Sequence, residues 1–296
     1  MSWSILFRPF ERLAGDEGLE VWYGRLLEAC GGKPAPFELA LSGGLWAATP
    51  GLAFLAGYQA ALRVLWPAAP WTLGALCVTE KRSTRPVDMS TRSCGSYVSG
   101  CKDFVTAAEA ADWLLVAARV DEDEDTPQLV ICVLHRGAPG VQVVPFPALP
   151  LMPDIGHARL HLEQAQGERL AGDGWTDYVR PFRTLEDVHV LAALCAWIVG
   201  VGRECAWSES LLLRLQALLA GCSEVARLSP AAATTHLLLA GLFAQYRQLT
   251  GEIDAAFSSG PAHWSVLWAR DRELLNIAES ARSKRLEKAR QSVTGN

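Results

Sequence analysis

The chain has 296 residues, of which half are hydrophobic and a fifth are charged, and its formal net charge is -5 at pH 7. This composition excludes a largely disordered chain, and the small negative charge gives no electrostatic reason to expect a nucleic-acid partner. Arg8 and Glu11 interrupt the N-terminal stretch, so no signal peptide is predicted. The longest apolar run, 188–202, is short for a bilayer span and contains His189. We therefore expect a cytoplasmic protein that does not enter a membrane.

Cysteine and histidine spacing gives no sign of a metal site. The eight cysteines are scattered, and no two of them stand as C-x-x-C. A zinc knuckle or a redox dithiol is therefore not predicted. His157 and His161 stand four residues apart, but their segment has the pattern of a strand and supplies no third ligand.

The first two thirds of the chain divide into a helical part and a β part. Residues 1–70 are predicted to form a reduced helical region, with apolar residues at three- and four-residue spacing and Pro50 at a helix start. Residues 71–180 hold short segments rich in β-branched residues and bounded by Gly, Pro or charge. No helix-length pattern separates them, which favours an antiparallel sheet or small barrel. The acidic run 121–125 is predicted to be a solvated hairpin loop.

Residues 181–296 return to helical periodicity, with four long helices joined by short connections. This pattern predicts an antiparallel four-helix bundle. Glu186 and Asp187 are expected in the first turn of its first helix, where the helix dipole favours acidic residues. The basic residues from Arg282 onward are expected to form a solvated helix face. The fold class predicted is thus α+β multidomain: helices, a β-barrel-like middle domain, and a bundle.

Two segments of the predicted β domain resemble the acyl-CoA dehydrogenase family. "CVTE", 77–80, is similar to the strand that opens the family's middle domain. Downstream, "SGCKDFVTAAEAADWLLVAARVD" has Phe104 and Thr106 at the family's aromatic and threonine positions, and Trp113 on the following strand. The resemblance is clearest over residues 70–205.

The resemblance implies an FAD-dependent enzyme that removes two hydrogens from the α and β carbons of an acyl-CoA thioester. Thr79 and Thr106 would then hydrogen-bond the polar edge of the isoalloxazine, and Phe104 would pack near the flavin. A glutamate takes the α-proton in the family, on the first bundle helix in some relatives. Glu186 and Asp187 are the candidates near that position.

The sequence also departs from the family pattern. In place of a proline and a tight small-residue turn after Glu80, it has "KRSTRP", 81–86, whose cations either face solvent or meet phosphate groups. It lacks the R-x-Q-F-G segment and the C-terminal motif that carries the glutamate base.

Two hypotheses follow: an FAD-dependent oxidoreductase acting on an acyl thioester or related small molecule, or a catalytically degenerate relative serving as a subunit, scaffold or binding module. A homo- or hetero-oligomer is expected in either case.

Overall fold

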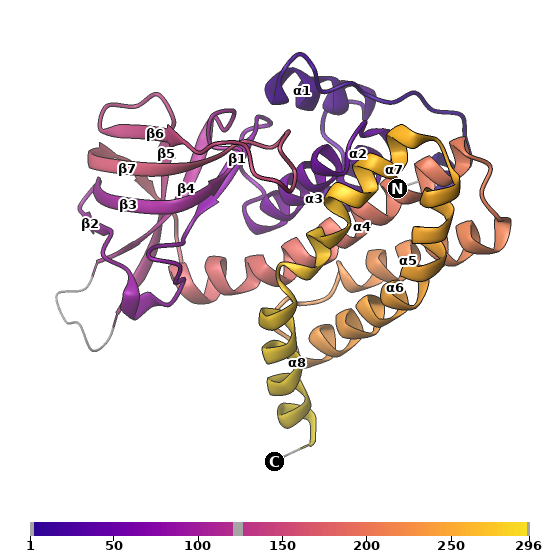
Figure 1. The fold of residues 1–296 in the computed structure, drawn as a ribbon. Helices are drawn as coiled ribbons and strands as arrows, with labels where there is room; N and C mark the ends of the chain where they lie inside the picture. The colour runs from indigo at the N-terminus through magenta and orange to yellow at the C-terminus, as the bar shows by residue number, and fades with distance from the viewer. Residues whose placement is uncertain (1–2, 121–126, 295–296) are drawn as a thin grey trace.

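The computed structural model describes residues 3–120 and 127–294, and the acidic run 121–125 lies outside them. Helices form the N-terminal part, a curled sheet follows, and helices return in the C-terminal part (Figure 1). The N-terminal helices are η1 (Trp3–Leu6), α1 (Leu19–Ala29), α2 (Pro36–Trp46) and α3 (Pro50–Leu65). Thr49 caps α3, because its side chain accepts a hydrogen bond from the Leu52 N–H, and Pro50 occupies the first turn as predicted.

The middle of the chain forms one sheet, as the sequence predicts. Within the described residues it has eight strands in the order β6-β7-β3-β2-β4-β5-β8, with β1 beside β4. Most neighbours are antiparallel, but β1 and β2 both run parallel to β4. The strands are β1 (Gly74–Cys77), β2 (Arg92–Cys94), β3 (Tyr97–Thr106), β4 (Trp113–Arg119), β5 (Leu129–His135), β6 (Val141–Pro145), β7 (His157–Gln166) and β8 (Glu168–Arg169).

Strand β4 is buried on both faces, which explains its continuous apolar sequence. Leu114 and Val116 point into the cluster enclosed by the curled sheet. Trp113 and Leu115 point the other way, into a cluster shared with α3 and the start of α4. This alternation follows from the two-residue period of a strand. The second cluster ties the sheet to the helices.

The C-terminal part contains the predicted helices, but the last of them is broken. Its helices are α4 (Arg180–Glu204), α5 (Glu209–Val225), α6 (Ala233–Ser259), α7 (Ala262–Asp271) and α8 (Glu279–Thr294). A 3₁₀ turn, η4 (Arg272–Asn276), separates α7 from α8. Asp271 at this break is 2% exposed, and its carboxylate accepts the Met152 N–H at 2.9 Å. We infer that this anchor fixes the position of the break.

Helix α4 is the central helix of the molecule and packs on α2 and α3 as well as on α5. Gly57 and Gly44 allow the close approach: a Cβ at Gly57 would lie 2.7 Å from the His189 carbonyl oxygen, and one at Gly44 would lie 2.1 Å from the Ala193 carbonyl oxygen.

Within the described residues, one helical stretch, Gly174–Glu204, is long and apolar enough to cross a membrane, and 94% of its apolar window is buried inside the protein.

The placement of Glu186 and Asp187 in the first turn was wrong. A π-helical turn, η3 (Gly174–Val179), runs directly into α4, so both residues lie well inside the helical stretch. Asp173 caps this stretch, because its carboxylate accepts the backbone N–H groups of Trp175 and Thr176. The helix dipole therefore does not account for the two acidic residues.

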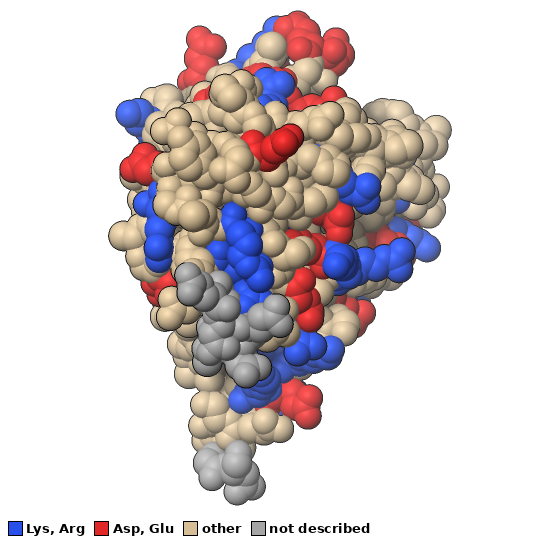
Figure 2. Space-filling model, turned by 90° about the vertical axis from the view of Figure 1, so that its left-hand side faces the viewer, with Lys and Arg blue, Asp and Glu red and all other residues tan. Residues whose placement is uncertain are grey.

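Charged side chains of both signs are interspersed on the face of the sheet domain in Figure 2. This mixture agrees with the small net charge of the sequence.

Candidate functional site

A cavity of about 360 Å³ lies where three parts of the molecule meet. Its walls come from one end of the sheet, from α3 and α4, and from the η4–α8 segment. All five site residues singled out in the sequence lie in its lining: Thr79, Phe104, Thr106, Glu186 and Asp187.

The sheet wall is built by β3 and by the chain that continues β1. The Asp103 N–H donates to the Thr79 carbonyl at 2.8 Å, which brings Thr79 alongside the end of β3. The pairing of β3 with β7 shifts register between Lys102 and Val105, and such irregularities re-aim side chains. Phe104 lies in this shifted stretch, with 43% of its side chain exposed, while Thr106 ends the strand. The hydroxyls of Thr79 and Thr106 bond no described residue.

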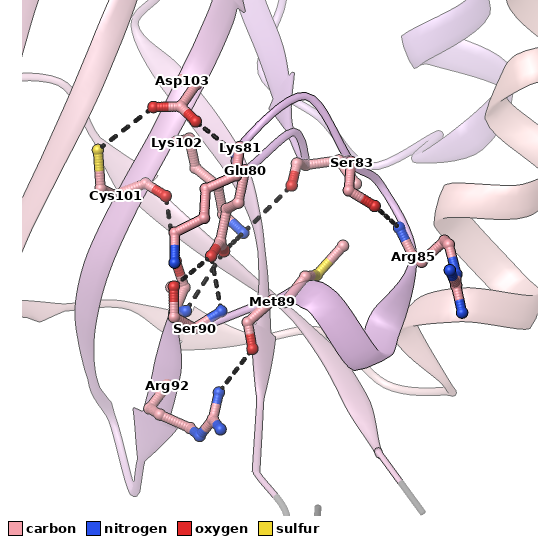
Figure 3. A network of polar contacts seen from close by, with 12 residues as sticks. Glu80, Lys81, Ser83, Arg85, Met89, Ser90, Arg92, Cys101, Lys102 and Asp103 are labelled. Atoms are coloured by element: carbon pink, nitrogen blue, oxygen red, sulfur yellow. Dashed lines mark hydrogen bonds and ion pairs between the residues drawn. The ribbon is translucent and has the colours of Figure 1, made fainter.

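A buried ion pair joins Glu80, the residue after Thr79, to Lys102 on β3 (Figure 3). The Lys102 ammonium, 0% exposed, lies 2.6 Å from the Glu80 carboxylate. Glu80 also accepts the Ser90 N–H at 2.6 Å and the Ser90 hydroxyl at 2.8 Å. Burial alone would raise the pKa of Glu80, but Lys102 and these hydrogen bonds outweigh it and lower the pKa to about 2. The pair fixes the start of the turn that follows Thr79.

The segment after Glu80 does form a tight turn, although it has no glycine. Glu80 and Ser83 exchange backbone hydrogen bonds of 2.9 and 2.8 Å. The two residues between them, Lys81 and Arg82, have φ values of 48° and 62°. Both are in the left-handed region, as a type I′ turn requires. Their side chains are exposed, which agrees with cations that face solvent and leaves them accessible to phosphate groups.

Glu186 is the isolated carboxyl group of the cavity. It makes no hydrogen bond or ion pair with a described residue and lies among Tyr58, Phe182 and Val190 in the apolar wall. Burial, together with the neighbouring charge of Asp187, raises the pKa of Glu186 to about 8, against the opposing effect of Arg183 and Arg285. Such a carboxyl can hold or release a proton near neutral pH.

Asp187 is tied to helix α8. It accepts a hydrogen bond from Arg282 at 3.0 Å and another from Arg285. Arg282 also lies 4.0 Å from the centre of the Phe243 ring. The expectation of a solvated basic face from Arg282 onward was therefore wrong for these two arginines, which are 13% and 19% exposed. Their partner Asp187 is 95 and 98 residues away in the sequence and cannot be seen from the local pattern.

Several lining residues were not predicted. His157 lies under Phe104, with the two ring centroids 4.6 Å apart, and Arg183 bonds the Thr84 hydroxyl at the mouth. His157 was considered only as a metal ligand, and its segment is the strand that the sequence predicts. Among the residues that the structure describes, no group of three His, Cys, Asp or Glu side chains is placed to hold a metal ion.

Comparison with known proteins supports the fold. No protein-family model and no curated protein matches the sequence. FkbI, solved in connection with the biosynthesis of a methoxymalonyl extender unit, matches with a TM-score of 0.63 and 19% identity, over 88% of this chain and 84% of its own. Butyryl-CoA dehydrogenase from Megasphaera elsdenii matches with a TM-score of 0.60 and 15% identity, over 93% of this chain and 83% of its own. The chain has the acyl-CoA dehydrogenase fold.

Glutaryl-CoA dehydrogenase from Mycobacterium smegmatis, solved with FADH2, matches at a TM-score of 0.58 and 13% identity, over 94% of this chain and 89% of its own. These values confirm, at the level of fold, the resemblance predicted from residues 70–205. They extend it to the helical regions, where the sequence alone shows little similarity.

Proposed function

We propose that the protein is an FAD-dependent oxidoreductase that removes two hydrogens from adjacent carbons of an acyl thioester or related small molecule. One observation carries the proposal: a single cavity brings the hydroxyls of Thr79 and Thr106 together with the unpaired Glu186. Glu186 comes from α4, more than 70 residues away from the two sheet residues, so only the folded chain assembles the set.

The cavity fits the flavin part of FAD. A volume of about 360 Å³ is within the range of small-molecule sites. Thr79 and Thr106 offer hydroxyls that bond no other described residue, and apolar side chains such as Val78 and Phe182 form walls for a planar ring. FAD, when bound, supplies an acceptor for the hydride. Thr79 and Thr106 would hold its polar edge, and Phe104 would pack against it.

Glu186 is proposed as the general base. Its pKa of about 8 makes the ionised Glu186 a stronger base than an ordinary carboxylate, and its oxygens bond no other described residue. One of its Oε atoms would take the proton from the carbon beside the thioester carbonyl. Because Asp187 already bonds two arginines, it is the poorer base of the pair. Its negative charge instead adds to the effect of burial, which raises the pKa of Glu186.

This assignment also bears on the degenerate alternative and on partners. A chain that had lost catalysis would have no reason to keep an unpaired carboxyl group in an apolar wall, since that group destabilises the fold. On this assignment the chain supplies its own general base. Assembly into a homo- or hetero-oligomer stays a prediction.

The test is to titrate FAD into the purified protein and then add short-chain acyl-CoA thioesters. We expect a bound flavin spectrum, a rise in melting temperature with FAD, and bleaching of the flavin band by a thioester. Glu186→Gln is the matched variant: it should bind FAD normally but fail to bleach. A colourless protein whose melting temperature does not respond to excess FAD would show the proposal to be wrong.

A further inference from the structure

His157 opens strand β7 and stands directly opposite Thr106 in the register of β3 with β7. Its side chain lines the cavity, although only 3% of the residue is exposed. The imidazole lies against the Phe104 ring, at 4.6 Å between centroids and 31° between planes. It is thus part of the same wall as Phe104 and Thr106, which we assign to the flavin.

One polar atom of this imidazole is unsatisfied. Its Nδ1 is buried and has no hydrogen-bond partner. Burial lowers the pKa of His157, and a hydrogen bond between the ring and the Ile155 backbone opposes the shift only in part. The ring is therefore neutral at pH 7, with one N–H donor and one lone-pair acceptor.

An unsatisfied buried nitrogen is unfavourable unless something bonds it. The χ2 torsion of histidine is broad, so the ring can turn to present Nδ1 to the cavity in exchange for its contact with the Ile155 backbone. The wall next to Thr106 then offers a hydroxyl and an imidazole nitrogen side by side.

We propose that His157 is a binding residue of this site, whose ring nitrogen hydrogen-bonds the polar edge of the planar heterocycle beside Thr106. The inference rests on the proposed function and deepens it, since it assigns the flavin a third polar contact on the sheet wall. In this role His157 positions the flavin ring, which does not require His157 to exchange a proton.

The test compares FAD binding to the wild type with binding to His157→Phe. Phenylalanine keeps the ring packing on Phe104 but has no nitrogen. We expect its FAD dissociation constant to rise about five- to tenfold, the effect of one lost hydrogen bond. The melting temperature of the FAD-free variant should stay the same or rise, because an unsatisfied buried group has been removed. His157→Asn, which restores a polar group, should recover part of the affinity.

His161→Phe is the control, because it makes the same change four residues along β7 at an exposed position outside the cavity. It should bind FAD as the wild type does. If His157→Phe does not fold, the smaller His157→Leu takes its place. A folded nitrogen-free variant that binds FAD within twofold of the wild type, with the same visible spectrum, would overturn the inference alone. A wild type that binds no FAD would overturn the proposed function and this inference with it.

Discussion

Asp187 on α4 accepts hydrogen bonds from Arg282 and Arg285 of α8, whereas its neighbour Glu186 has no such bond with any described residue. The two carboxyl groups differ by one position on a helix, which turns about 100° per residue. One therefore faces the arginines and joins α4 to α8. The other faces the apolar part of the cavity.

Glu186→Gln should stabilise the protein in a pH-dependent manner. The pKa of Glu186 is raised from 4.5 to about 8, so the folded state holds the proton more tightly than the unfolded state does. The wild type therefore loses stability as pH rises from about 4.5 to about 8. We expect the variant to gain ~1–3 kcal/mol in the free energy of unfolding at pH 8 and nothing at pH 4. Urea titrations across this range measure the difference. Glu287→Gln, at an exposed position of α8, should show none.

Asp187→Asn should destabilise the protein, because it leaves two mostly buried guanidinium groups without their anion. Breaking such a pair costs about 3 kcal/mol. The same change should lower the pKa of Glu186, since the Asp187 charge raises it. Chemical denaturation gives the first effect, and the pH dependence of thioester-driven flavin bleaching gives the second. Equal stability of the variant and the wild type would show that α8 is not held by these contacts.

Lys102→Met should destabilise the sheet domain by roughly 3–5 kcal/mol, because it leaves the buried Glu80 carboxylate without its cation. A double variant, Glu80→Leu with Lys102→Met, should recover most of the loss. In the wild type the pKa of Glu80 is lowered to about 2, so this residue's contribution is complete above pH 4.5 and is lost as pH falls toward 2. Denaturation at several acidic pH values would reveal that loss. A single variant as stable as the double one would contradict the pairing.

Arg82→Gly and Lys81→Gly should each stabilise the turn by ~0.5–1 kcal/mol, because both residues have a positive φ that glycine adopts without strain. Arg85→Gly is the control on the same segment. Its φ is -73°, so glycine there should bring no gain. Thermal unfolding of the three variants measures these changes in stability. If Arg85→Gly also stabilised the protein, relief of backbone strain would be ruled out as the explanation.

Thr106→Val should raise the dissociation constant for FAD about three- to tenfold, because valine keeps the shape of threonine but has no hydroxyl. Stability without FAD should change little, since this hydroxyl bonds no other described residue. Fluorescence titration with FAD measures the affinity. Thr234→Val, on the exposed side of α6, should leave it unchanged.

The sequence shows the sheet wall of the site but not the α-helical one. Phe104 and Thr106 lie on one strand, which is recognised by its residue pattern and by its spacing from the neighbouring strands, all within about fifty residues of sequence. Glu186 could not be separated from Asp187, because their difference depends on where α4 begins and on what packs beside it. The start is set by the Asp173 cap, which lies several residues before the apparent first turn. The arginines come from the end of the chain.

His157 was missed for a different reason. A lone histidine on a strand gives no signal of its role until its register partner is known. The pairing of β3 with β7 joins residues 51 to 69 positions apart, and the irregularity near Phe104 hides the register from the pattern. The break between α7 and α8 is also tertiary in origin, since it coincides with a contact to Met152.

The central position of α4 has a consequence for biosynthesis. This helix is apolar enough to cross a bilayer and would be a hazard if it left the ribosome with no surface to cover it. Helices α2 and α3 precede it in the chain and are its main packing partners, so part of its binding surface has already been synthesised when it emerges. The order of elements along the chain thus shortens the time during which this long apolar helix is exposed.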